Sequence, residues 1–109
     1  MKGQTVAGDY YDYIGKPRMA SNAYKRALLL DPNQSTPLIA LGNLMQISAP
    51  IIASTLKVIL RKYVQASIIQ PDSIPALNNI AAVYLKLKRP LVALETLKLV
   101  TKIDPLNVR

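Results

Sequence analysis

Three segments of the sequence share one feature, a run of mainly apolar residues that ends in proline. Proline cannot extend a helix, and it disfavours the helical conformation in the residue before it, so each run is expected to be a helix that ends there. A small residue followed three positions later by a large one recurs upstream of each run. The sequence therefore predicts one helical unit repeated three times. The proline-ended runs are residues 27–32, 66–71 and 100–105, and the pairs are Gly8 with Tyr11, Gly42 with Met45 and Ala81 with Tyr84.

The spacing between these landmarks fixes the length of the unit. The small residues are 34 and then 39 positions apart, whereas the prolines are 39 and then 34 positions apart. The unit is therefore 34 residues long, and the second unit carries five extra residues between Met45 and Tyr63. We expect a single domain over 1–109 with repeats at about 1–34, 35–73 and 74–107. The predicted helices are 3–14, 18–30, 36–48, 51–69, 75–87 and 91–103, and no segment shows a strand pattern.

The unit resembles the tetratricopeptide repeat, whose helix-turn-helix pattern has small and aromatic residues at set places and a closing proline. The resemblance covers nearly the whole chain and implies an all-α, right-handed α-solenoid of three helical hairpins. The matching residues are Gly8, Tyr11, Gly15, Ala20, Tyr24, Ala27 and Pro32 in the first unit, Leu38, Leu41, Gly42, Tyr63, Ala66 and Pro71 in the second, and Leu77, Ile80, Ala81, Tyr84, Ala93, Leu97 and Pro105 in the third.

The resemblance also implies a function, the capture of a peptide or helix from another protein in a concave groove. In this architecture the first helix of each hairpin lines the groove. Asparagine and glutamine there both donate and accept hydrogen bonds, so they suit the peptide groups of a ligand, although each amide alone also fits a solvated helix surface. On the face opposite the core, helical spacing places Thr5, Asp9, Asp12, Tyr13, Ile39, Asn43, Gln46, Asn78, Ala82, Leu85 and Lys86.

One ligand class of the family is predicted to bind poorly. Relatives that hold the C-terminal carboxylate of heat-shock chaperones do so with Lys, Asn and Arg on the first helices of two units. The corresponding places here hold Thr5 and Asp9, then Pro75 and Asn79. Because Asp9 would repel a carboxylate, we expect no tight binding of chaperone tails.

The charge balance suggests an alternative function. Fourteen Lys and Arg against six Asp and Glu give a net charge of +8, which favours anionic partners. Seven of the cations would form a basic rim for RNA or another polyanion. The same lysines and arginines fit an ordinary solvated surface, and no aromatic or glycine-rich pattern points to base stacking. The rim residues are Lys16, Arg18, Lys57, Arg61, Lys62, Lys88 and Arg89.

Catalysis is poorly supported by the composition. The chain has no Cys and no His, which excludes thiol nucleophiles, Ser-His-Asp triads and histidine-based zinc sites. The close carboxylate pair of Asp9 and Asp12 leaves a carboxylate hydrolase as the weakest alternative. We therefore expect no enzyme activity, no cofactor and no metal.

The last predicted helix is apolar on two faces. Val92, Leu94, Leu99 and Ile103 add to its core positions, and no polar capping helix follows within the sequence. We expect this end to contact another subunit, another copy of the chain, or further repeats. The chain is thus predicted to be a scaffold or adaptor in a larger assembly.

The sequence shows neither an apolar signal segment nor a membrane-spanning segment, and this predicts where the protein is located. The first residues have no apolar signal segment, and the apolar stretch 51–69 contains three cations, which argues against insertion in a bilayer. We expect a cytoplasmic or organelle-interior protein.

Overall fold

The computed structural model describes residues 2–49 and 51–106, and six helices account for most of them. No strand is present among these residues, so the all-α prediction is confirmed. Every helix lies within two residues of its predicted bounds. The helices are α1 (Lys2–Tyr13), α2 (Pro17–Leu30), α3 (Ser35–Ser48), α4 (Ala53–Ile69), α5 (Ile74–Lys86) and α6 (Pro90–Ile103).

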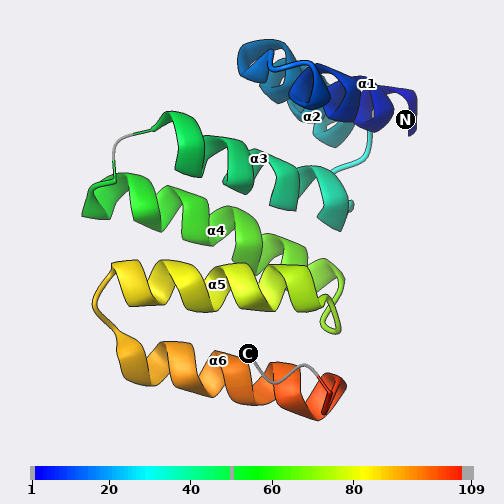
Figure 1. Ribbon diagram of the computed structural model, residues 1–109. Coiled ribbons are helices and arrows are strands. Elements are labelled where there is room, and N and C mark those ends of the chain that lie inside the picture. The colour runs from blue at the N-terminus through cyan, green and yellow to red at the C-terminus, as the bar shows by residue number, and fades with distance from the viewer. Residues whose placement is uncertain (1, 50, 107–109) are drawn as a thin grey trace.

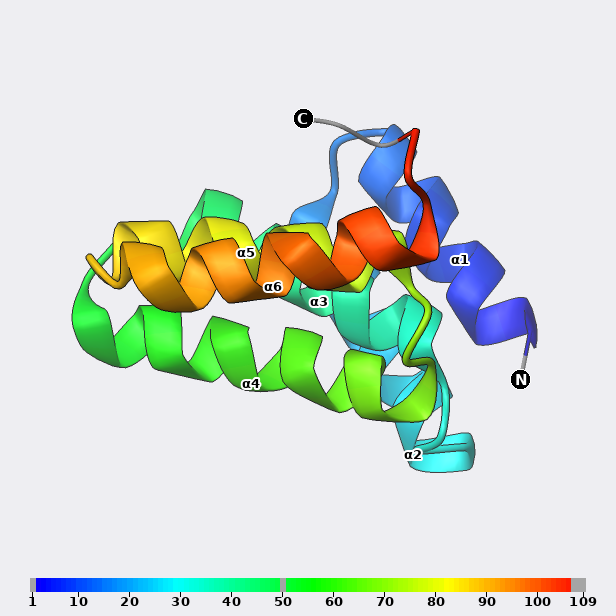
Figure 2. The same ribbon diagram turned by 90° about the horizontal axis from the view of Figure 1, so that it is seen from below.

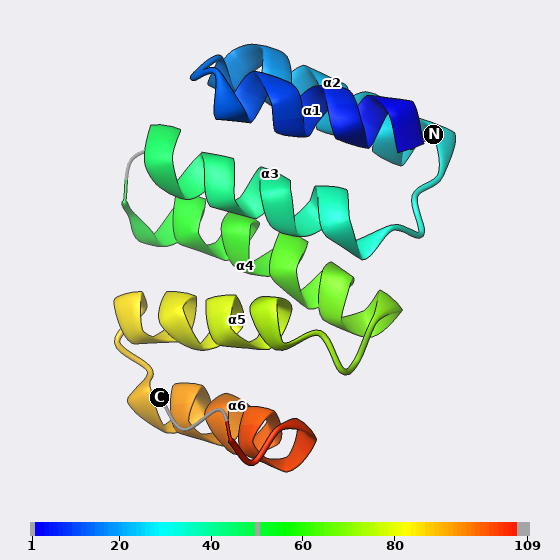
Figure 3. The same ribbon diagram turned by 45° about the vertical axis from the view of Figure 1, so that its right-hand side comes forward.

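Consecutive helices form three antiparallel hairpins that stack in chain order (Figure 1). The links within hairpins lie on one side of the stack and the links between hairpins on the other, as Figure 3 also shows. Figure 2, a view from below the stack, shows α1 turned away from the direction that α4, α5 and α6 share. The stack therefore twists, as expected of a helical solenoid.

Proline determines where the second helix of each hairpin ends. The last backbone N–H of α2 comes from Asp31, which donates to the Ala27 carbonyl at 3.0 Å, and Asp31 itself is extended, with φ −147° and ψ 99°. The residue before a proline prefers this extended region. Gln70 and Asp104 end α4 and α6 with the same hydrogen bond, so the repeated sequence produces a repeated helix terminus.

Within the first two hairpins, a tyrosine of the second helix packs against a glycine of the first. Tyr24 and Tyr63 are 1% and 0% exposed. A Cβ atom added to Gly8 would lie 2.5 Å from the Tyr24 ring, and one added to Gly42 would lie 2.5 Å from the Tyr63 ring. The glycines are therefore required for this approach. The third hairpin has Ala81 at the equivalent position, and there the tyrosine is replaced by the shorter Leu97.

Packing between hairpins joins α2 to α3 and α4 to α5. Tyr63 lies in the largest core cluster, which α4, α5 and α6 form together. Its buried members, besides Tyr63, are Leu56, Ile59, Leu77, Ile80, Val83 and Val100. Neighbouring hairpins thus share one core, which is why such units depend on their neighbours for stability.

The five extra residues of the second unit are mostly helical. The α4 helix has 17 residues, whereas α2 and α6 have 14 each. Counted from Gly42 and Tyr63, three of the extra residues extend the start of α4, one extends α3 and one lengthens the link between them. The insertion therefore leaves the Gly42–Tyr63 contact in place.

No helix in the described ranges 2–49 and 51–106 has both the length and the apolar character needed to span a membrane.

The glycine–tyrosine contact makes a testable prediction for Gly42→Ala. The added methyl group would overlap a fully buried ring, and overpacking of this kind costs about 1–3 kcal/mol, which exceeds the gain of about 1 kcal/mol in helix propensity. We expect a net loss of unfolding free energy in urea denaturation. Gly3→Ala is the matched control, because nothing lies within 4 Å of its Cβ position.

A second substitution separates overpacking from other causes. In a Tyr63→Leu background, which reproduces the Ala81–Leu97 pair of the third hairpin, the cost of Gly42→Ala should fall by about 1 kcal/mol or more. An unchanged cost in that background would show that the ring is not what excludes a side chain at position 42.

Candidate functional site

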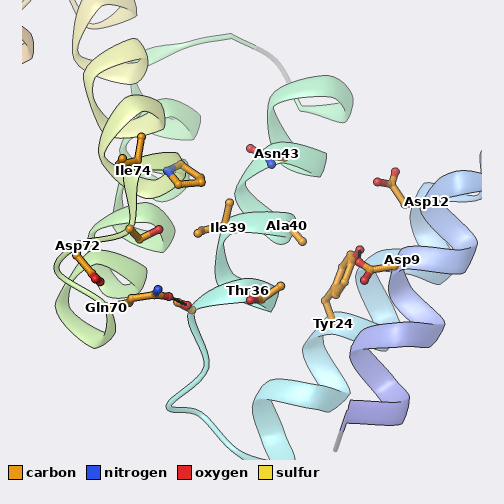
Figure 4. A pocket seen from close by; sticks show the side chains of 13 residues that line it. Asp9, Asp12, Tyr24, Thr36, Ile39, Ala40, Asn43, Gln70, Asp72 and Ile74 are labelled. Carbon is orange, nitrogen blue, oxygen red and sulfur yellow. Dashed lines mark hydrogen bonds between the residues drawn. The ribbon is translucent and has the colours of Figure 1, made fainter. Parts of the chain in front are cut away.

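A groove of about 640 Å³ lies along one face of the hairpins and is open to solvent. Figure 4 shows its three parts, with α1 and the Tyr24 side chain on one wall, α3 in the middle, and the α4–α5 link on the other wall.

The first wall carries two carboxylates from α1. Asp9 and Asp12 are exposed, and the Tyr24 hydroxyl reaches across from α2 to donate to Asp9 Oδ1 at 2.5 Å. Burial, the hydrogen bond to Asp9 and the negative charges of Asp9 and Asp12 together raise the pKa of Tyr24 well above its usual range. Tyr24 is therefore a neutral donor at physiological pH, and it holds Asp9 at the groove.

The middle of the groove is a stripe of α3 residues one helical turn apart. Thr36, Ile39, Ala40 and Asn43 line it, a spacing that places all four on one face of the helix. Ile39 and Ala40 are half-buried and apolar, whereas Thr36 and Asn43 are exposed. The stripe offers an apolar strip with polar groups at both ends.

Asn43 belongs to a hydrogen-bond network that joins α3 to α4 and α5. Its Oδ1 accepts from the Tyr63 hydroxyl at 2.6 Å and from Asn79 Nδ2 at 3.2 Å. Gln46 Nε2 donates to the same hydroxyl at 2.7 Å, and Lys86 Nζ donates to Gln46 Oε1 at 2.6 Å. Burial raises the pKa of Tyr63, while the bond from Gln46 acts in the opposite direction. The network fixes side chains that sequence alone would leave free for a ligand.

The second wall comes from the link between α4 and α5 and from the first residues of α5. Gln70, Asp72 and Ser73 of the link line it, together with Ile74 and Pro75 of α5. The Ser73 side chain is buried and accepts from the Ala76 N–H at 3.3 Å, so it caps α5. Ser35 Oγ donates to Gln70 Oε1 at 2.8 Å, which ties the start of α3 to this link.

Four of the residues predicted for the groove line it, namely Asp9, Asp12, Ile39 and Asn43. The other seven do not line this groove. Thr5 is half-buried, with an Oγ1 atom that has no hydrogen-bond partner among the described residues. Tyr13 is 90% exposed. Gln46 and Lys86 bond to each other, Asn78 and Ala82 are half-buried on α5, and Leu85 is exposed.

Some lining residues were not predicted. Thr36 and Ala40 share the helical spacing of Ile39 and Asn43, so that periodicity could have found them. Tyr24 matches the repeat pattern and its ring is buried, but its hydroxyl reaches the groove. The residues of the α4–α5 link carry no periodic signal that could have placed them.

The predicted basic rim is spread over two regions. Lys16, Arg18, Lys88 and Arg89 are exposed at the links within the first and third hairpins, which lie on one side of the stack (Figure 1). On α4, Lys57 and Arg61 are exposed, whereas Lys62 is half-buried and lines a separate hollow with Leu28, Pro32 and Leu38.

The last helix exposes the apolar side chains singled out from the sequence. Val92, Leu94, Leu99 and Ile103 are between 39% and 49% exposed, and only Ala93, Thr96 and Val100 of α6 are buried. Helical spacing places Val92, Leu99 and Ile103 on one flank of this buried stripe and Leu94 on the other.

The groove residues offer charged, hydrogen-bonding and apolar groups. Among the described residues, no group of three or more His, Cys, Asp or Glu could hold a metal. Carboxylates, amides, a hydroxyl and an apolar strip can together bind a polypeptide, because they match charged, peptide and aliphatic groups respectively.

A profile of the tetratricopeptide repeat family matches residues 3–34 and 74–105, more than half of the chain. The chain belongs to the tetratricopeptide repeat family. The two matched stretches cover the first and third hairpins of this tetratricopeptide repeat (TPR) domain, and the hairpin with the five-residue insertion lies outside them. The resemblance inferred from the sequence is thus confirmed.

Solved structures show the same fold. The crystal structure of MamA is similar with a TM-score of 0.82 and 18% identity, over 95% of this chain and 58% of MamA. The first TPR of Spaghetti (RPAP3) bound to the HSP90 peptide SRMEEVD is similar with a TM-score of 0.80 and 16% identity, over 95% of this chain and 80% of that one. The TPR domain described here therefore spans a little over half of MamA. A sequence search of curated proteins finds no match.

The Tyr24 environment predicts a pH dependence of stability. Because its pKa is higher in the folded than in the unfolded protein, its contribution is fully present below about pH 10 and is lost as the pH rises above that value. Urea denaturation from pH 8 upward should show stability falling above about pH 10, with a shallower fall in Tyr24→Phe. Tyr13→Phe, at an exposed position, should match the wild-type slope, and equal slopes in all three proteins would contradict the prediction.

Proposed function

We propose that this TPR domain is a non-enzymatic interaction module that holds a peptide or helix of another protein in the groove between α1, α3 and the α4–α5 link. The observation that carries the proposal is the groove itself, in which an apolar strip on α3 lies between two polar walls. Apolar side chains of a ligand can pack on Ile39 and Ala40 while its peptide groups reach Asn43 and Gln70. The similar RPAP3 domain was solved with a peptide, which is consistent with this use of the fold.

We further propose that the module works inside a larger assembly, as a scaffold or adaptor. Repeat arrays normally end in a helix with a polar outer face, because an apolar one would be exposed to water. The α6 helix instead exposes Val92, Leu94, Leu99 and Ile103 on the two flanks of its buried stripe. This supports a neighbouring subunit, or further repeats, covering those flanks in the complete assembly.

Position-specific photo-cross-linking tests the groove as the binding site. A benzophenone amino acid at Thr36, which is exposed in the groove, should cross-link to protein in lysate of the source organism, and the cross-links should persist after nuclease treatment. The same amino acid at Arg26, exposed on α2 and outside the groove, is the matched control and should give many-fold fewer cross-links.

Two results would contradict the proposal. Equal labelling from Thr36 and Arg26 would mean that the groove is not the binding site. Loss of the captured material on nuclease treatment would instead favour the basic rim and a polyanionic partner, since phosphate contacts do not require a protein ligand.

A further inference from the structure

The acidic side chains of this basic protein are concentrated in the groove. The chain carries a net charge of +8 with only six acidic residues. Three of those six, Asp9, Asp12 and Asp72, line the groove, whereas none of its described lining residues is Lys or Arg. The groove therefore has the opposite sign to the protein as a whole.

The acids outside the groove all have structural partners. Asp31 and Asp104 accept backbone N–H groups of their own turns at 3.1 Å, and Glu95 pairs with Lys98 at 3.3 Å. That pair is the one ion pair among the described residues. These three side chains are thus accounted for by the fold.

Two of the three groove carboxylates have no such partner. Asp9 accepts the Tyr24 hydroxyl, whereas the carboxylates of Asp12 and Asp72 bond to no side chain or backbone group in the described ranges. With fourteen cations in the chain, none of the described ones is used to neutralise these carboxylates. Their charges are left available to a ligand.

The carboxylates lie on opposite walls, Asp9 and Asp12 on α1 and Asp72 on the α4–α5 link, with α3 between them (Figure 4). They do not converge on a metal-binding point. An extended cationic ligand could contact both walls while its apolar side chains pack on Ile39 and Ala40 of the α3 strip.

The net positive charge of the protein does not prevent a cationic ligand from binding in the groove. At physiological ionic strength, charges farther away than a Debye length of about 8 Å are largely screened at an exposed site, so the nearest charges dominate. The charges nearest to a ligand in the groove are the carboxylates of Asp9, Asp12 and Asp72.

Building on the function proposed above, we propose that the groove selects an extended peptide of another protein in which Lys or Arg alternates with apolar residues. The cations of the peptide contact Asp9 and Asp12 on one wall and Asp72 on the other.

Fluorescence anisotropy with three labelled octapeptides tests the proposal. They alternate leucine with lysine, with glutamate or with glutamine. The lysine peptide should bind most tightly to the intact domain, against the net charge of the protein, and its binding should weaken as salt is raised.

Two matched variants of equal net charge locate the effect. Asp9→Asn/Asp12→Asn/Asp72→Asn should weaken binding of the lysine peptide by about tenfold, or ~1.4 kcal/mol. Asn at position 9 can still accept the Tyr24 hydroxyl. Asp31→Asn/Glu95→Gln/Asp104→Asn removes three charges elsewhere and should leave the affinity unchanged. Circular dichroism and thermal melts check that both variants fold.

Several outcomes would overturn the proposal. Tighter binding of the glutamate peptide, equal binding of all three peptides, no binding, or equal loss in both variants would each do so. Self-association by light scattering that disappears in the groove variant would show that the occupant is a second copy of the chain. The proposed function is judged separately by cross-linking at Thr36, so the two ideas can fail independently.

Discussion

The close contact between a glycine and a buried tyrosine organises the first two hairpins. Because Gly8 and Gly42 have no side chain, the rings of Tyr24 and Tyr63 lie directly against the first helix of each hairpin. The hydroxyl of each tyrosine then donates to the residue after the glycine, Asp9 or Asn43, and both of these residues line the groove. One packing contact therefore sets both the core and the polar surface of the groove.

The third hairpin shows what the contact contributes. Ala81 and Leu97 replace the glycine and the tyrosine, so this hairpin has no tyrosine hydroxyl at the equivalent position. The groove lies against the first two hairpins and the start of the third, ending at Pro75.

The helices could be predicted because their determinants are local and repeated. Proline ends each second helix, and periodicity marks each apolar face. The groove could be predicted only where it follows helical spacing, as at Asp9, Asp12, Ile39 and Asn43. Asp72 and its neighbours lie in a link, where no periodicity applies and position depends on how α4 and α5 pack. Helical spacing also places Gln46 at the groove, but its side chain bonds to Tyr63 and Lys86. These bonds depend on how α3 packs against α4 and α5, which helical spacing does not determine.

An NMR titration tests most directly whether the acidic groove is the ligand site. The lysine–leucine octapeptide would be added to ¹⁵N-labelled protein and the backbone amide shifts followed. We expect the largest changes at Asp9, Thr36, Asn43 and Asp72. Changes centred instead on α6 or on the links within the hairpins, with the groove amides unmoved, would contradict it.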